Sequence, residues 1–212
     1  MQTIAIIDYN MGNLHSVERA VSHAAGKNAT VAITADPDFI VKADRVVFPG
    51  QGAARDCMRE LETRGMADVV REVIRTKPFL GICMGMQVLM QHSEENGGID
   101  CLGVYDGNVR YFGAAHQAQG VRLKIPQMGW NQIWQQTAHP LWQGISDGAR
   151  FYFVHSYYVE PQTPDLIAGA TEYGITYACA IAKDNVFAIQ AHPEKSADDG
   201  LQLLTNFINW QI

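Results

Sequence analysis

Phe79-Leu80-Gly81-Ile82-Cys83-Met84-Gly85 is a short apolar run that ends in a cysteine with a glycine two places away on either side. The apolar residues predict a buried strand, and residues 86–90 after them predict a helix. One reactive side chain at a sharp strand-to-helix turn is typical of a nucleophile elbow, whose strained central residue needs small neighbours. The start of a helix would also favour the thiolate of Cys83. The motif alone leaves a second interpretation open, because a buried cysteine is often only a small hydrophobic residue.

Strands and helices alternate through the first half of the chain. Apolar runs predict strands at residues 3–8, 29–34 and 45–48, and helical spacing predicts helices between them. The first run is almost wholly apolar, as in a strand that is buried on both faces of a parallel sheet. The pattern predicts an α/β fold with a doubly wound, mostly parallel central sheet. Sites in such sheets lie beyond the carboxyl ends of the strands, where Cys83 and the Pro49-Gly50-Gln51-Gly52 loop fall.

The second half has shorter strands with two-sided patterns. Residues 176–182 and 186–190 flank Lys183-Asp184-Asn185, which predicts a hairpin and an antiparallel excursion from the main sheet. Residues 111–120 are predicted to form a mobile surface loop. No linker or repeat interrupts the chain, so residues 1–212 are expected to form a single domain. Further strands are predicted at residues 109–112, 122–125, 130–134, 150–158 and 167–172.

Composition excludes several classes of protein. The net charge of −6 argues against a nucleic-acid partner, and no apolar run approaches the length that spans a membrane. No two of the four cysteines form a C-x-x-C pair, so neither a metal site nor a disulfide framework is expected. The N-terminal residues lack the features of a secretory signal. These observations predict a reduced, cytoplasmic enzyme.

A second candidate segment, Gln190-Ala191-His192-Pro193-Glu194, follows the last predicted strand. Pro193 biases His192 toward an extended backbone, in which residues two apart point the same way. Glu194 can then orient the imidazole, and a cysteine, a histidine and an orienting acid form a nucleophilic triad. The alternative is a surface-loop histidine beside a solvated charge.

The elbow, the Pro49-Gly50-Gln51-Gly52 loop and the His192-Pro193-Glu194 segment, in this order, resemble the class I (triad) glutamine amidotransferases. Within that family the chain is similar to the glutaminase subunits of imidazole glycerol phosphate synthases, in histidine biosynthesis. The likeness extends over essentially the whole chain. It implies a flavodoxin-like fold and an enzyme that hydrolyses glutamine to glutamate and ammonia. Two further segments that support this branch are Asp8-Tyr9-Asn10-Met11-Gly12-Asn13-Leu14 and Met128-Gly129-Trp130-Asn131.

The resemblance implies a role for each candidate residue. Cys83 attacks the carboxamide of L-glutamine and forms a thioester, His192 moves the proton, and Glu194 orients His192. Backbone N–H groups of Met84 and of the Gly50-Gln51 peptide would stabilise the oxyanion. The implied glutamine-binding residues are Gly52, Gln87, Ser156 and Tyr157.

The resemblance also implies a partner and no cofactor. The partner would be a (β/α)8-barrel cyclase that forms a heterodimer with this chain and consumes the ammonia, making imidazole glycerol phosphate and aminoimidazole carboxamide ribonucleotide. Trp130, Tyr152 and Lys195 align with family segments that face the cyclase, and aromatic and cationic side chains suit an interface. The alternative for Trp130 and Tyr152 is a place in the core.

Two residues depart from the family pattern, and three other functions stay open. Many relatives have a small apolar residue in place of Gln51 and a phenylalanine in place of Ala191, but neither change removes a catalytic atom. The first alternative is a class I glutaminase that serves another pathway. The second is a cysteine peptidase-like relative with the same elbow, and the third is a binding module without activity.

Overall fold

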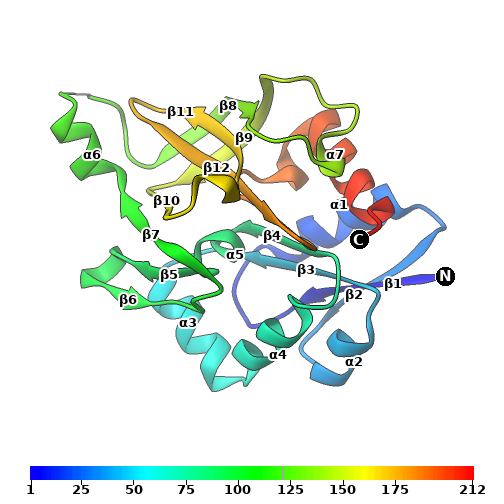
Figure 1. Ribbon diagram of the computed structural model, residues 1–212. Helices are drawn as coiled ribbons and strands as arrows, with labels where there is room; N and C mark the ends of the chain where they lie inside the picture. The colour runs from blue at the N-terminus through cyan, green and yellow to red at the C-terminus, as the bar shows by residue number, and fades with distance from the viewer. Residues whose placement is uncertain (121) are drawn as a thin grey trace.

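A parallel sheet forms the centre of the molecule in the computed structural model, which describes residues 1–120 and 122–212. Its strands follow the order β2-β1-β3-β4-β13, and each neighbouring pair is parallel (Figure 1). This is the flavodoxin-like order of a doubly wound sheet, so the predicted fold class is confirmed. The strands are β1 (Gln2–Ile7), β2 (Ala29–Thr34), β3 (Arg45–Gly50), β4 (Phe79–Cys83) and β13 (Val186–Ile189).

Helices cover both faces of this sheet (Figure 1). On one face, α1 (Leu14–Ala25) and α7 (Ala197–Asn209) enclose a core that includes Val47 and Leu80 of the sheet. On the other face lie α2 (Pro37–Lys42), α3 (Ala54–Thr63) and α4 (Met66–Val73), packed on Phe48 and Phe79. Because both faces are buried, the central strands are apolar at almost every position, as the sequence predicts.

Mostly antiparallel strands extend the sheet beyond β13 and form the predicted excursion, although β5 and β7 within it are parallel. The order continues as β12-β10-β7-β5-β6, while β11 pairs with β12 and β8, and β8 pairs with β9. β12 and β13 form the expected hairpin, in which Lys183 pairs with Val186. These strands are β5 (Met90–Ser93), β6 (Ile99–Asp100), β7 (Tyr105–Tyr111), β8 (Gln127–Gln135), β9 (Ala149–His155), β10 (Tyr157–Pro161), β11 (Ile167–Glu172) and β12 (Thr176–Lys183).

Two predictions about local structure are wrong: the helix expected over residues 86–90 and the strand expected over residues 122–125. The helix after Cys83, α5 (Met84–Gln87), is shorter than predicted, and Met90 already begins β5. A short apolar run does not distinguish a buried helix from a buried strand, and here pairing with β7 decides for the strand. Residues 122–125 form no strand.

The segment predicted to be a mobile loop is instead a helix, α6 (Phe112–Ala118). Phe112 and His116, four residues apart, are buried side chains on one face of this helix. The Phe112 ring packs against aromatic rings that include Tyr173 and Tyr177. Contact with residues distant in the sequence therefore orders the segment, and a local pattern carries no sign of it. Short 3-10 helices complete the chain: η1 (Glu95–Gly97), η2 (Pro140–Trp142), η3 (Pro164–Leu166) and η4 (Pro193–Lys195). Within the described residues, no helix has the length and apolar character needed to cross a membrane.

Candidate active site

Cys83 occupies a strained turn between β4 and α5. Its backbone has φ 55° and ψ −109°, a conformation that residues other than glycine rarely adopt. A Cβ at Gly85 would overlap the carbonyl oxygen of Phe48, and one at Gly81 would lie 2.8 Å from the carbonyl oxygen of Gly85. The two glycines are therefore needed because the elbow is packed tightly against itself and against β3.

His192 and Glu194 come next to the elbow because β13 runs parallel to β4. Ile189 pairs with Ile82, so the segments that follow these two strands leave the sheet at the same edge. His192 Nδ1 lies 2.8 Å from Glu194 Oε1, and the two side chains are only 2% and 1% exposed. The extended backbone expected at His192 is present, with φ −104° and ψ 95°.

The surroundings of His192 favour its charged form. Burial lowers the pKa of His192, but its interactions with Cys83 and with Glu194 outweigh burial and raise this pKa to about 10. Nε2 is buried and has no hydrogen-bond partner among the described residues, which leaves it free to exchange a proton with the thiol. Cys83, His192 and Glu194 can therefore act as a nucleophile, its base and the acid that orients the base.

The loop after β3 lies beside the elbow, since Gly50 pairs with Cys83. A Cβ at Gly50 would overlap the Tyr9 hydroxyl, so only glycine fits there. The Gln51 carbonyl accepts a hydrogen bond from the Cys57 thiol at 3.5 Å, and the Tyr9 hydroxyl donates to Cys57 Sγ at 3.8 Å. Burial raises the pKa of Cys57 to about 12, so this thiol stays protonated and can donate.

A cavity of about 390 Å³ opens at Cys83 and collects most of the predicted site residues. Gln87 is only 2% exposed, and its Nε2 donates to the carbonyl oxygen of Tyr157 at 3.1 Å. Gln87 Oε1 is buried and has no hydrogen-bond partner among the described residues. The predicted residues in the cavity lining are Gln51, Gly52, Cys83, Met84, Gln87, Ser156, Tyr157, His192 and Lys195.

The predicted interface residues lie together, and one of them, Lys195, also lines this cavity. The rings of Trp130 and Tyr152 are 6.1 Å apart in an edge-to-face arrangement, and Trp130 is 45% exposed. Lys195 Nζ lies 6.0 Å from the centre of the Tyr152 ring. Trp130 is therefore not a core residue, which removes that alternative for it.

Sequence reasoning missed two polar side chains of the site, Glu95 and Gln190. Glu95 lines the cavity, its Oε2 accepts from the backbone N–H of Ala54 at 2.6 Å, and burial raises its pKa. No local signal indicates this role, because Glu95 follows a segment predicted to be helical. Gln190 is fully buried, and its Nε2 lies 3.6 Å from Cys83 Sγ. A signal existed here, since extended chain places Gln190 on the same side as His192.

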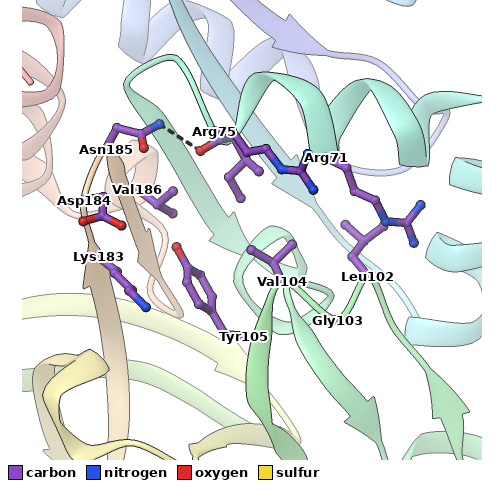
Figure 2. Close-up of a pocket in the computed structure, with 11 residues that line it drawn as sticks. Arg71, Arg75, Leu102, Gly103, Val104, Tyr105, Lys183, Asp184, Asn185 and Val186 are labelled. Atoms are coloured by element: carbon purple, nitrogen blue, oxygen red, sulfur yellow. Dashed lines mark hydrogen bonds between the residues drawn. The ribbon is translucent and has the colours of Figure 1, made fainter.

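A larger cavity, of about 630 Å³, lies at the opposite, amino-terminal end of β4 and β13 (Figure 2). Arg71, Arg75 and Lys183 line it together with Tyr105, and Asn185 Nδ2 donates to the carbonyl oxygen of Ile74 at 2.8 Å beside it. No cysteine or histidine is among the described residues of its lining. The smaller cavity at Cys83 is therefore the candidate active site. Within residues 1–120 and 122–212, no group of three His, Cys, Asp or Glu side chains could hold a metal ion.

Comparisons with known proteins relate this chain to one family. The family model described as glutamine amidotransferase class-I matches residues 5–210. The chain is 58% identical to the imidazole glycerol phosphate synthase subunit HisH of Thiobacillus denitrificans, over 98% of this chain and 91% of that protein. It is 56% identical to the subunit of the same name from Pseudomonas putida, over 99% of this chain and 98% of that protein.

Solved structures share the fold at low sequence identity. A structure of PurLQS from Thermotoga maritima superposes with a TM-score of 0.65 at 15% identity, over 98% of each chain. A crystal structure of a glutamine amidotransferase superposes with a TM-score of 0.68 at 14% identity, over 93% of this chain and 94% of the other.

Proposed function

This chain belongs to the class I glutamine amidotransferase family, and from that premise we propose that it is the glutaminase subunit of an imidazole glycerol phosphate synthase. It hydrolyses L-glutamine to glutamate and ammonia in histidine biosynthesis. Relatives that are more than half identical over nearly their whole length carry the name of that subunit, which supports this branch over glutaminases of other pathways. The whole chain acts as a single class I amidotransferase domain.

Catalysis runs through Cys83, His192 and Glu194. The Cys83 thiolate attacks the carboxamide carbon of glutamine, the C–N bond breaks, and His192 gives a proton to the departing ammonia. The resulting γ-glutamyl thioester is hydrolysed by a water that His192 deprotonates, which releases glutamate and restores the thiol. The 2.8 Å contact between Nδ1 and the Glu194 carboxylate supports an orienting role for Glu194.

The tetrahedral intermediates need hydrogen-bond donors at the developing oxyanion. We assign them to the backbone N–H of Met84 and to that of Gln51 in the Gly50-Gln51 peptide. The pairing of Gly50 with Cys83 brings this peptide to the elbow, and glycines on both sides of Gln51 allow it to reorient. A partner that favours the productive orientation would switch turnover on.

The cavity at Cys83 suits the charged end of glutamine. The Glu95 carboxylate would bind the α-ammonium group, and the unpaired Gln87 Oε1 is a second acceptor in the same cavity. Gly52, Ser156 and Tyr157 supply backbone groups along the cavity wall. No cofactor takes part in this mechanism.

The partner is a (β/α)8-barrel cyclase subunit that uses the ammonia. We place it over Trp130, Tyr152 and Lys195, because these side chains are contiguous and Lys195 also lines the cavity at Cys83. Met128, on the same strand as Trp130, is 65% exposed and extends the apolar part of this surface. Docking there would place the partner at the mouth of the glutaminase site.

The observation that carries this proposal is the meeting of a strained cysteine with the buried His192–Glu194 pair at one cavity. The test is the release of glutamate from free glutamine, with peptide amides as the competing substrate class. Cys83→Ala should abolish glutamine hydrolysis, while the control Cys101→Ala, at a half-buried cysteine away from the cavity, should retain it. Cleavage of peptides in preference to glutamine, or an active Cys83→Ala variant, would reject the proposal.

A further inference from the structure

The side chain of Gln190 lies between the candidate nucleophile, Cys83, and the side chain of Gln87. The triad mechanism gives Gln190 no role. It directly follows β13 and is fully buried. Its Nε2 lies 3.6 Å from Cys83 Sγ, while its Oε1 accepts a hydrogen bond from Gln87 Nε2 at 2.9 Å. One buried amide therefore spans the distance between the sulfur and a second glutamine side chain.

The backbone of Tyr157 determines which end of the Gln190 amide faces the sulfur. A carbonyl oxygen only accepts hydrogen bonds, so the Gln87 atom that lies 3.1 Å from the Tyr157 carbonyl oxygen is its NH₂ group. The same Gln87 nitrogen contacts Gln190, which must present its oxygen there. The NH₂ group of Gln190 is thus left to point at Cys83. The orientation follows from the hydrogen-bond network, which is how amide ends are assigned in general.

We propose that Gln190 is a further catalytic residue, whose amide N–H donates a hydrogen bond to the Cys83 thiolate and favours that form over the thiol. This inference rests on the proposed function, in which Cys83 Sγ is the attacking atom. A donor gains more from a charged acceptor than from a neutral one, and a site shielded from water strengthens the difference. The donor also limits the positions of the sulfur before attack. Gln87 acts behind it as a positioning residue, since it holds the Gln190 amide in this orientation.

Two substitutions separate this role from a structural one. Gln190→Met removes both the donor to Cys83 and the acceptor for Gln87. Gln190→Glu keeps the acceptor for Gln87 but cannot donate as a carboxylate, and it adds a negative charge beside the sulfur. Gln190→Asn, whose amide is too short to reach Cys83 in the same position, replaces the Met variant if that variant does not fold. Gln91→Met and Gln91→Glu, at an exposed position on β5, are the matched controls.

The measurement is the rate at which iodoacetamide alkylates Cys83 as a function of pH, followed by mass spectrometry of the peptide that contains it. We expect Gln190→Met to move the midpoint of the profile upward by on the order of one pH unit. Gln190→Glu should move it further, because an anion next to the sulfur opposes ionisation. At neutral pH, kcat/KM for glutamine should fall about tenfold in the Met variant and recover as the pH rises. The Gln91 variants should match the wild type.

Two results would overturn the inference. The first is an unchanged midpoint in both Gln190 variants. The second is a normal profile in Gln190→Glu with a shifted one in Gln190→Met, which would show that Gln190 serves only to hold Gln87. The alkylation profile needs no glutamine turnover, so it decides this inference even if the glutaminase assay rejects the proposed function. Thermal unfolding of each variant shows that the measurements refer to folded protein.

Discussion

The strain at Cys83 makes a prediction about stability that is separate from catalysis. A residue with a side chain at φ 55° and ψ −109° costs about 1–3 kcal/mol, because its Cβ crowds the neighbouring backbone. Alanine retains this cost and glycine does not. A glycine lowers the stability of the folded state by about 0.5–1 kcal/mol relative to alanine, because it has more conformational freedom in the unfolded chain. Cys83→Gly should therefore be more stable than Cys83→Ala by roughly 1 kcal/mol.

The assay is equilibrium unfolding in urea with both variants, in which the midpoint moves while the slope stays constant. In thermal unfolding, 1 kcal/mol corresponds to about 2–4 °C for a chain of this size. Cys179 on β12 provides the control, since it is also buried and is not among the residues with positive φ. There the order should reverse, with Cys179→Gly less stable than Cys179→Ala by about 0.5–1 kcal/mol. A Cys83→Gly variant that is less stable than Cys83→Ala would refute the claim that the elbow is strained.

Three further predictions concern the groups around the nucleophile. Glu95→Gln should raise KM for glutamine with a smaller change in kcat, because it removes a charge that binds the α-ammonium group; an unchanged KM in steady-state kinetics would contradict this. Gly50→Ala should lower kcat by about a hundredfold or more, because the new Cβ overlaps the Tyr9 hydroxyl and displaces an oxyanion donor. Normal turnover in that variant would exclude the loop from catalysis. The raised pKa of His192 means that its protonation stabilises the folded state, fully below about pH 6.5 and less as the pH rises toward about 10. The stability advantage of the wild type over His192→Gln in urea unfolding should therefore shrink between pH 7 and 10, and a growing advantage would contradict the sign of the shift.

The parts of this fold that could be predicted from sequence are those that local patterns specify. Apolar runs predict the buried strands β1, β3 and β4, and turn residues predict the hairpin of β12 and β13. Asp36 followed by Pro37 is a typical sequence for the start of a helix, and Asp36 does cap α2 by accepting from the backbone N–H of Asp38. The helix α6 could not be predicted, because the aromatic residues that bury it come from distant parts of the chain.

The same distinction applies to the site. Cys83, His192 and Glu194 could be predicted as candidates because each lies in a motif whose spacing indicates the chemistry. Ser196 resembles the first residue of a capping box, yet its hydroxyl donates to the His192 carbonyl oxygen and accepts from the backbone N–H of Tyr152. Glu95 enters the cavity only through the path of the chain after α5. Residues brought in by tertiary packing carry no periodicity, so a single sequence does not reveal them.

The central claim is that Cys83 releases ammonia from glutamine for a reaction on a partner subunit. The most direct measurement compares glutamine with free ammonium as the nitrogen source for the complex of this chain with the proposed cyclase subunit, with the chain as wild type or Cys83→Ala. The account predicts that Cys83→Ala loses turnover with glutamine and keeps wild-type turnover with ammonium, because only the glutaminase step needs the thiolate. Glutamine-driven turnover by the Cys83→Ala complex would contradict it.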